Sequence, residues 1–416
     1  MATRFNAYNT TNPEELLLLK KQEAAALLQV VRSISLTLEP EELINLVCIT
    51  SINQLGINKL ILVTYLEEQF AIQFHHGFDY CNVEELKSLR TIGQLTKISN
   101  PSEFNLPAIG IEYVIPLGNP QAPGGWFLIA DFADSEAEAE NDLIFIETIG
   151  NILIISLYNI HYFHAKLKER DLLLELEVAG RLQKQALPSN FNINSRLDIY
   201  AVNVAHHKVA GDFYDLLTLN PNEIVFCIGD VSGKGIPAAL LVANIQANIR
   251  ALFNAETPLH RIIRQLHQAI YSVSTDEEFV TLFIGKLNLR KENIVYINAG
   301  HNPIFLIRKE GIIKELSKGC IPLGLLPIRE IELGTEKFYP GDSLFLYTDG
   351  VVEEMNANGE LLGSEVIKQL LLEKRTYTSQ QIILDVLQLV WKHAQSYNKS
   401  YSLSDDVSMM MIKFLK

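Results

Sequence analysis

Two apolar segments in the second half of this chain end abruptly in an aspartate, and this pattern restricts the folds that the chain can adopt. Residues 223–230 predict a buried strand that stops at Asp230, and residues 344–349 predict another that stops at Asp349. A carboxylate at the end of a strand is held by a rigid element, as a precise site requires. Glycine beside each aspartate lets backbone or solvent approach closely. We therefore expect a functional site at these strand ends.

Two further acidic segments belong to the same pattern: Asp212 lies within residues 210–215, and Asp405 lies within residues 404–408. Carboxylates that converge without Arg or Lys repel one another, and a hard divalent cation relieves that repulsion. Oxygen ligands favour Mg²⁺ or Mn²⁺ over zinc. Two such ions, about 3.5–4 Å apart, can activate a water and hold a phosphoryl group. A single aspartate would more often be a turn residue, so the prediction depends on all four segments.

Other phosphate-binding and hydrolytic motifs do not fit the sequence. The spacing from Gly229 to Gly233-Lys234 is one residue short of a P-loop, and Gly235 stands where that motif needs Ser or Thr. Ser232 is not framed by the glycines of a nucleophile elbow. No H-E-x-x-H segment occurs.

Composition restricts the class of protein. The length of 416 residues predicts two or three domains. The net charge of −14 disfavours a nucleic-acid partner. The four cysteines stand apart, which indicates a reducing compartment and no zinc site. The longest apolar stretch, residues 143–160, is interrupted by polar residues and is short for a membrane span. We expect a cytoplasmic protein without a membrane partner.

The first part of the chain predicts a helical extension over residues 1–24, followed by an α+β domain. Asn12 and Pro13 suit a helix start, and Pro40 opens a second helix. A further helix is expected from near Glu136. Strands are expected at residues 60–66, 70–75, 113–117 and 126–131, with turns at Gly118 and at residues 120–125. Helices would thus flank an antiparallel sheet.

The order of these elements, the strand pair VIPLG…GGWFLIADF and the closing helix DLIFIETIGNILIISLYN resemble a GAF domain over residues 25–157. The resemblance implies a sensor for a small molecule or a protein signal. A GAF-like domain that has lost its ligand and serves only for dimerisation fits the same residues, because fold does not fix function.

Residues 158–187 predict an amphipathic linker helix. Its apolar positions recur at spacings of three and four residues and their sums: Phe163, Leu167, Leu174, Val178 and Leu182. About two heptads are readable, so a dimeric coiled coil and a helix packed on its own neighbouring domain both remain open.

Beyond residue 187 six motifs occur in a fixed order: VAGDFYD, GDVSGKGIPAALL, FVTLFIGKL, NAGHNP, LYTDGVVE and DDVSMM. Over residues 188–416 they resemble the SpoIIE-type branch of the metal-dependent, type 2C (PPM) serine/threonine phosphatases, which includes bacterial stress-response and sporulation regulators. The upstream segment LEVAGRLQKQALP resembles the linker helix of that branch. The resemblance implies an α-β-β-α sandwich with metals between the loops at one end.

The resemblance also implies roles for individual residues. Asp230 would bridge two Mn²⁺ or Mg²⁺ ions, and the carbonyl of Val231 would bind one of them. Asp349 and Asp405 would bind the other ion, and Asp212 would join through a metal or its water. A metal-activated water, held by Asp230 and Asp349, would attack phosphorus directly without a phosphoenzyme.

Other residues near these motifs carry open assignments. The role of Asp406 is open, and Lys234 could contact phosphate at a helix start or be a solvated lysine. His301 could be catalytic, but a structural role in its turn is favoured. Ser232 stands where the eukaryotic pattern has a histidine, so no leaving-group acid is identified. Ala210 stands where the family motif before Asp212 usually has a second glycine. We expect this replacement to have little effect unless the backbone at residue 210 needs a positive φ.

The resemblances together lead us to expect a GAF-regulated signalling phosphatase that acts as a homodimer. Its substrate would be a phosphorylated anti-sigma-factor antagonist in a partner-switching circuit. The linker helix would transmit the state of the sensor, which requires a two-state element. An alternative is a catalytically inactive adaptor with a phosphatase fold, although the retained aspartates argue against it. A third possibility is a small-molecule receptor in which the phosphatase is a minor output.

Overall fold

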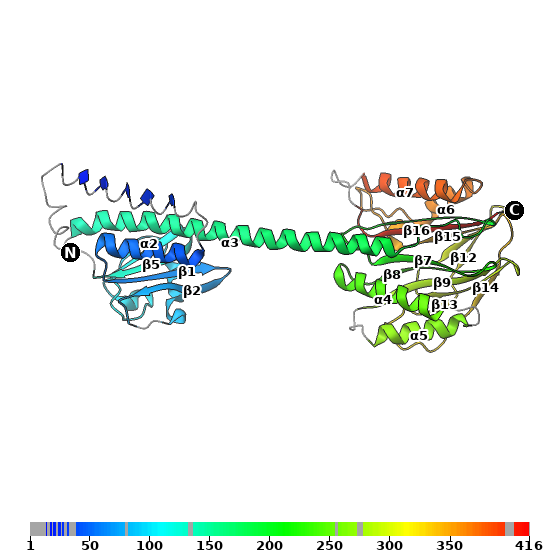
Figure 1. Ribbon diagram of the computed structural model, residues 1–416, viewed down its shortest axis with the longest axis horizontal. Coiled ribbons are helices and arrows are strands. Elements are labelled where there is room, and N and C mark those ends of the chain that lie inside the picture. Colours follow the sequence, from blue (N-terminus) through cyan, green and yellow to red (C-terminus); the bar gives the residue numbers. More distant parts are fainter. Residues whose placement is uncertain are drawn as a thin grey trace. The chain divides into compact units, whose positions relative to one another are not determined.

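The computed structural model describes residues 39–79, 82–131, 136–253, 257–272, 278–395 and 403–415, together with part of residues 14–32. The chain forms two compact units, Met1–Glu169 and Arg170–Lys416. Figure 1 shows the elements of each unit. The helix start predicted at Asn12 and Pro13 lies outside the described residues.

The N-terminal unit contains an antiparallel sheet with strands in the order β2-β1-β5-β4-β3. Its elements are α2 (Pro40–Leu55), β1 (Lys59–Leu66), β2 (Gln69–His76), the 3₁₀ helices η1 (Val83–Thr91) and η2 (Pro101–Phe104), β3 (Thr96–Lys97), β4 (Tyr113–Asn119), β5 (Ala122–Ala130) and the first part of α3 (Glu136–Ala186). One core lies where α2 and α3 pack on the sheet, and a second core includes η1. The predicted antiparallel sheet flanked by helices is confirmed.

The turn predicted over residues 120–125 is shorter than expected, because β5 already begins at Ala122. Gly124 and Gly125 are strand residues against which α3 packs closely. A Cβ atom at Gly125 would lie 2.7 Å from the Cδ1 atom of Ile154, and one at Gly124 would overlap the ring of Tyr158. The glycines therefore provide room for a helix and do not form the turn.

Helix α3 is a single helix of 51 residues, so the helix expected near Glu136 and the predicted linker helix are continuous. It is long and apolar enough to cross a membrane, but half of its most apolar 18-residue window is buried inside the protein. Ile146, Ile149 and Leu153 of this helix are fully buried in the core of the N-terminal unit. Core packing thus accounts for much of its apolar character.

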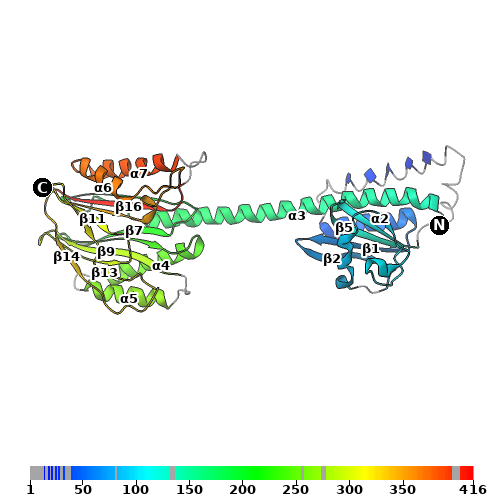
Figure 2. The same cartoon turned by 180° about the vertical axis from the view of Figure 1, so that it is seen from behind.

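The C-terminal unit is a sandwich of two sheets covered by helices on both outer faces (Figure 2). One sheet has the order β13-β10-β9-β8-β7 with β14 paired to β10, and the other has the order β12-β11-β15-β16-β6. Helices α4 and α5 cover the first sheet, and α6 and α7 cover the second. The expected α-β-β-α layering is therefore confirmed. The bounds are β6 (Leu197–Val204), β7 (Asp212–Asn220), β8 (Glu223–Val231), α4 (Ile236–Leu252), α5 (Leu259–Tyr271), β9 (Val280–Asn288), β10 (Asn293–Ala299), β11 (Ile304–Ile307), β12 (Ile313–Leu316), β13 (Gly319–Cys320), β14 (Gly334–Lys337), β15 (Ser343–Tyr347), η3 (Asp349–Val351), α6 (Ser364–Glu373), α7 (Ser379–Gln395) and β16 (Val407–Phe414).

Two antiparallel strand pairs, one in each sheet, bring the acidic segments together. Strand β7 pairs with β8 so that Asp212 lies opposite Asp230. Strand β15 pairs with β16, which places Asp349, just after β15, next to Asp405, just before β16. The strand predicted to reach Asp349 ends at Tyr347, because the chain turns there into η3. The apolar residues of all four strands hold these ends in the cores of the sandwich.

Candidate functional site

Asp212 and Asp230 form the centre of the acidic cluster. Asp212 is 2% exposed, and its Oδ2 atom accepts a hydrogen bond of 2.6 Å from the hydroxyl of Thr348. Burial raises the pKa of Asp212 well above its usual range, and the neighbouring carboxylate of Asp230 raises it further. Burial also raises the pKa of Asp230 to about 7, with added repulsion from Asp349 and Asp405. The site therefore favours a positive charge among these carboxylates.

Thr348 connects the two sheets at this centre, a role that the sequence motif did not indicate. Its backbone N–H donates to the carbonyl of Ser408 at 3.0 Å, and its hydroxyl oxygen accepts from the N–H of Ser408 at 2.9 Å. Asn203 adds a bond of 3.1 Å to the carbonyl of Asp212 and one of 2.8 Å to the hydroxyl of Ser408. Strands β6, β7 and β16 are thus fixed around one carboxylate.

Asp349 follows β15 and is held by its own turn. Its Oδ1 atom accepts a hydrogen bond of 2.8 Å from the N–H of Gly350. A Cβ atom on Gly350 would overlap the carbonyl oxygen of Asp406, so only glycine lets the 405–406 segment pass this close. Burial raises the pKa of Asp349, and the carboxylate of Asp405 adds to the rise. The sequence-based expectation that glycine allows close backbone approach is confirmed here.

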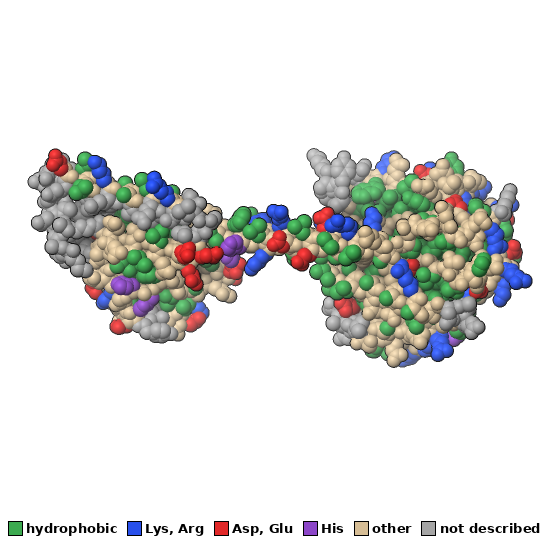
Figure 3. All heavy atoms as spheres, viewed as in Figure 1, with side chains coloured by type: hydrophobic (Ala, Val, Ile, Leu, Met, Phe, Trp, Pro, Cys, Tyr) green, Lys and Arg blue, Asp and Glu red, His purple; other side chains and the backbone are tan. Residues whose placement is uncertain are grey.

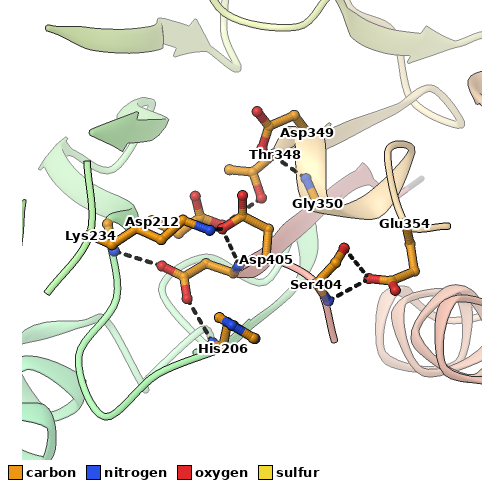
Figure 4. Close-up of polar contacts among 11 residues, drawn as sticks. His206, Asp212, Lys234, Thr348, Asp349, Gly350, Glu354, Ser404 and Asp405 are labelled. Carbon is orange, nitrogen blue, oxygen red and sulfur yellow. Dashed lines mark hydrogen bonds and ion pairs between the residues drawn. The ribbon is translucent and has the colours of Figure 1, made fainter. Parts of the chain in front are cut away.

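Asp405 lies at the open side of the cluster, with its side chain 48% exposed. Its Oδ1 atom lies 3.4 Å from the ammonium nitrogen of Lys234, which extends from the segment between β8 and α4 (Figure 4). The preceding residue, Ser404, is fixed because its N–H and hydroxyl both donate to the carboxylate of Glu354 at 3.0 Å. Glu354 is buried and thereby anchors the segment that carries Asp405.

Both carboxylate oxygens of Asp406 accept backbone hydrogen bonds. Its Oδ1 atom accepts from the N–H of His206 and its Oδ2 atom from the N–H of Gly211, both at 2.7 Å. Asp406 therefore anchors the β6–β7 loop, which we define as residues 205–211. His206 and His207 of this loop line a pocket together with Lys234, Asp230 and Asp405. The sequence analysis did not single out these histidines.

Three oxygen atoms converge beside Gly211 in a manner that fits a hard cation. A Cβ atom at Gly211 would lie 3.0 Å from the carbonyl oxygen of Val231, 3.5 Å from Oδ1 of Asp230 and 3.8 Å from the carbonyl oxygen of Gly233. Carboxylate and carbonyl oxygens are ligands that Mg²⁺ and Mn²⁺ prefer. Glycine at 211 keeps this space open. The carbonyl of Gly233 is a candidate ligand that sequence reasoning missed, because backbone ligands leave no residue-type signal.

The side chains alone do not form a complete ligand set. Among the described residues, no group of three or more His, Cys, Asp or Glu side chains stands ready to hold a metal ion. The fit to a cation therefore depends on Asp230 with backbone carbonyls. Asp349 and Asp405 lie close enough to raise the pKa of Asp230, but their side chains would have to turn inward to complete a second ligand set.

Ser232, His301 and Ala210 occupy defined structural positions. The hydroxyl of Ser232 accepts from the N–H of Phe279 at 2.8 Å. His301 is buried, and its Nε2 atom lies 3.0 Å from the carbonyl of Tyr347, so Nε2 donates there and Nδ1 accepts from a threonine hydroxyl at 2.9 Å. Burial lowers the pKa of His301 to about 4. Ala210 is not among the described residues with positive φ. Its backbone conformation therefore does not require the glycine that the family motif usually has at this position.

Comparisons with known proteins agree with this fold. The family model "Stage II sporulation protein E (SpoIIE)" matches residues 220–415. The protein IcfG of a Synechocystis species is 26% identical over 377 residues, which cover 77% of this chain and 59% of that protein. The phosphoserine phosphatase RsbU of Bacillus subtilis is 25% identical over 248 residues, which cover 59% of this chain and 71% of that protein. The matched part of this chain thus spans less than two thirds of the length of IcfG.

Among solved structures, the SiaA-PP2C domain of Pseudomonas aeruginosa superposes with a TM-score of 0.51. The match covers 59% of this chain and 98% of that domain, at 16% sequence identity. At this level of identity the similarity concerns the fold, and it identifies the two-sheet sandwich as a PP2C-type arrangement.

Proposed function

We propose that the C-terminal domain of this chain is a metal-dependent protein phosphatase of the SpoIIE type, which hydrolyses phosphoserine or phosphothreonine in a protein substrate. The observation that carries this proposal is the convergence of the Asp230 carboxylate with the carbonyl oxygens of Val231 and Gly233. Such a group of oxygens, next to mutually repelling carboxylates, fits Mn²⁺ or Mg²⁺.

Each residue of the cluster has a distinct part in this proposal. Asp230 and the carbonyl of Val231 would hold one ion, Asp230, Asp349 and Asp405 would hold the other, and Asp212 would assist through a metal or its water. When bound, the two ions would supply a nucleophilic water and neutralise the charge of the phosphoryl group. Thr348 keeps Asp212 oriented, and Lys234 lies near enough to Asp405 to contact an incoming phosphate.

Phosphate release from a phosphoserine-containing protein tests the activity. Full-length protein should release phosphate in Mn²⁺ and not in EDTA, and Asp349→Asn should abolish the release. Glu310→Gln removes an exposed carboxylate elsewhere in the same domain and should leave the rate unchanged. Mn²⁺-independent release, or full activity in Asp349→Asn, would count against the proposed site. If neither phosphate release nor Mn²⁺ binding were observed, the inactive adaptor would be the better account.

For the substrate, we propose a phosphorylated anti-sigma-factor antagonist of a partner-switching circuit. The support is the similarity to RsbU, whose name identifies it as a phosphoserine phosphatase. Rates with such a phosphoprotein should exceed those with a phosphoserine peptide of unrelated sequence. Equal rates would indicate that the catalytic domain does not select this class of partner.

We propose that the N-terminal unit is a GAF-like sensor that regulates the phosphatase, either by binding a small ligand or by dimerising. Thermal shifts with cyclic nucleotides would detect a ligand, because binding to the folded state alone raises stability. Deletion of residues 1–157 should change the rate or the Mn²⁺ requirement. An unchanged rate, together with no response to ligands, would contradict regulation by this unit.

We further propose a homodimer that forms through an exposed apolar face of α3. Phe163, Leu174 and Leu182 are 61%, 49% and 62% exposed, and Figure 3 shows apolar and charged side chains next to one another on the exposed part of this helix. Paired helices would bury these side chains. Sedimentation should show a dimer that Leu174→Glu dissociates, whereas the exposed Lys168→Glu should not. A monomeric wild-type chain would exclude this interface.

A further inference from the structure

Residues 352–363, which connect η3 to α6, form a hairpin beside the acidic cluster, and we call this segment the 352–363 hairpin. Its two arms meet in a bridge between Met355 and Leu361. The N–H of Asn356 donates to the carbonyl of Glu360 at 3.0 Å, and the Oδ1 atom of Asn356 accepts the N–H of Glu360 at 3.0 Å. Backbone and side-chain bonds therefore both close the turn of this hairpin.

The hairpin is attached to both segments that carry the aspartates at the open side of the cluster. The N–H of Glu353 donates to the carbonyl of Asp349 at 2.8 Å. The carboxylate of Glu354 accepts the N–H and the hydroxyl of Ser404, the residue before Asp405, and Figure 4 shows these two side chains facing one another. The hairpin thus begins next to one aspartate and is bonded next to the other.

Two apolar side chains of the hairpin face solvent. Met355 is 48% exposed and Leu361 is 52% exposed, whereas their chain neighbours Glu354 and Leu362 are buried. This alternation follows from the strand geometry, in which successive side chains point to opposite faces. Residues that lie opposite each other in an antiparallel bridge share one face, with Cβ atoms about 4.5–5.5 Å apart. The two side chains therefore form one exposed apolar patch, which we call the Met355–Leu361 pair.

The charge around this pair is negative. The hairpin carries exposed carboxylates at Glu353 and Glu360, and its sequence contains no Lys or Arg. Opposite charges across an interface favour the correct partner and disfavour partners of like charge. The surface of the hairpin therefore fits an apolar side chain that has a basic side chain beside it.

The cavity at the cluster is too small to hold more than a phosphoryl group and the side chain that carries it. Its volume is about 100 Å³, and Asp405 and Lys234 line it. Such a cavity has room for several waters. A stable contact between two proteins covers about 800 Å² of each partner, so a protein substrate must also lie on the surface around the cavity. The hairpin is part of that surface, because it is bonded to the residue that precedes Asp405.

We propose that the Met355–Leu361 pair is a docking surface for the protein substrate, and that it receives an apolar side chain close to the phosphoserine with Lys or Arg next to it. This inference rests on the proposed function of the cluster as a protein phosphatase. The pair contacts the polypeptide and not the phosphoryl group. It therefore lowers KM for suitable substrates without taking part in the hydrolysis.

Two matched phosphoserine peptides and a small phosphoester test the proposal on the full-length chain at saturating Mn²⁺. One peptide has leucine and lysine on both sides of the phosphoserine. Its counterpart has alanine in place of each leucine and glutamate in place of each lysine. The small ester is p-nitrophenyl phosphate, which has no polypeptide to reach the hairpin. We expect kcat/KM for the leucine–lysine peptide to exceed that for its counterpart, through a lower KM.

Met355→Ser and Leu361→Ser each remove one side chain of the pair. The substrate can cover only the exposed half of each side chain, so kcat/KM for the leucine–lysine peptide should fall about fivefold in each variant. The rate with p-nitrophenyl phosphate should match the wild type. Glu360→Gln should reduce the preference for lysine and weaken its dependence on salt.

Ile312→Ser is the matched control. Ile312 is 63% exposed and lies in the turn between β11 and β12. The pairing of β11 with β15 places this turn at the end of the sheet where β15 begins, whereas Asp349 follows the other end of β15. This variant should match the wild type with all three probes.

Equal kcat/KM for the two peptides in the wild type, or an unchanged preference in both Met355→Ser and Leu361→Ser, would overturn the inference. A loss of equal size with the peptides and with p-nitrophenyl phosphate would also overturn it, because such a loss would indicate a structural role of the hairpin. No hydrolysis of any probe would contradict the proposed function, and this inference with it. Failure of the inference alone is therefore distinguishable from failure of the proposed function.

Discussion

The carboxylate cluster should destabilise the metal-free protein at neutral pH, and Asp230→Asn should therefore make that protein more stable. The pKa of Asp230 rises from 3.8 to about 7 in the folded chain. The folded state then binds more protons than the unfolded state between these values, so stability falls as the pH rises through this window. A rise of about three pKa units corresponds to about 4 kcal/mol.

Because solvent still reaches part of the Asp230 side chain, we expect about half of that value, a gain of about 2 kcal/mol for Asp230→Asn at pH 8. For a domain of this size the gain raises the midpoint of thermal unfolding by about 4–8 °C. The gain should shrink at pH 5, where the wild-type carboxyl is already protonated in the folded state. The variant should also fail to bind Mn²⁺.

Scanning calorimetry of the full-length chain in EDTA measures this effect. The transition of the catalytic domain is the one that Mn²⁺ shifts upward in the wild type. Glu310→Gln, an exposed carboxylate outside the cluster, is the control and should have no effect. A less stable Asp230→Asn at pH 8, or a gain that does not depend on pH, would refute the electrostatic reasoning.

Three further substitutions test individual contacts. Thr348→Val removes the hydroxyl that is hydrogen-bonded to Asp212. The free energy of unfolding, measured with denaturant, should fall by about 1–3 kcal/mol, and activity should require more Mn²⁺. Wild-type values for both would show that the bond is dispensable. Gly350→Ala places a Cβ atom against the carbonyl of Asp406. The free energy of unfolding in the same assay should fall by about 2 kcal/mol. A variant as stable as the wild type would contradict this close packing. The pKa of His301 is lowered to about 4, so at this group the folded state binds fewer protons than the unfolded state. From pH 7 to 4 His301 should therefore contribute a loss of about 3 kcal/mol in stability, opposite in sign to the contribution of Asp230. His301→Gln should lack this component of the pH slope, and identical slopes would show that the histidine is not buried neutral.

The strand ends that carry the aspartates could be predicted because their signal is local. An apolar run followed by aspartate and glycine indicates the strand and its approximate end: β8 ends at Val231, one residue beyond Asp230, and β15 ends at Tyr347, two residues before Asp349. The sequence analysis assigned the helix that closes the N-terminal domain and the linker helix to separate segments, whereas the structure joins them. Residues 136–186 form one helix, which the sequence supports because it contains no proline.

The contacts that orient the site could not be read from the sequence. Thr348 and Asp212 are separated by 136 positions, and Glu354 and Ser404 by 50, so tertiary packing alone brings these partners together. The carbonyl oxygen of Gly233, a candidate metal ligand, has no residue-type signature either. Gly124 and Gly125 were predicted to lie in a turn but lie in a strand on which α3 packs closely. Glycine is common both in turns and at close contacts, and the local sequence does not distinguish the two.

The most direct test of a metal-dependent site is a calorimetric titration of Mn²⁺ into EDTA-treated, dialysed full-length protein, with phosphate release measured on the same samples. The account predicts saturable binding of two ions, phosphate release that rises with occupancy, and the loss of both in Asp230→Asn. Phosphate release without bound Mn²⁺, or Mn²⁺ binding that survives Asp230→Asn unchanged, would contradict it.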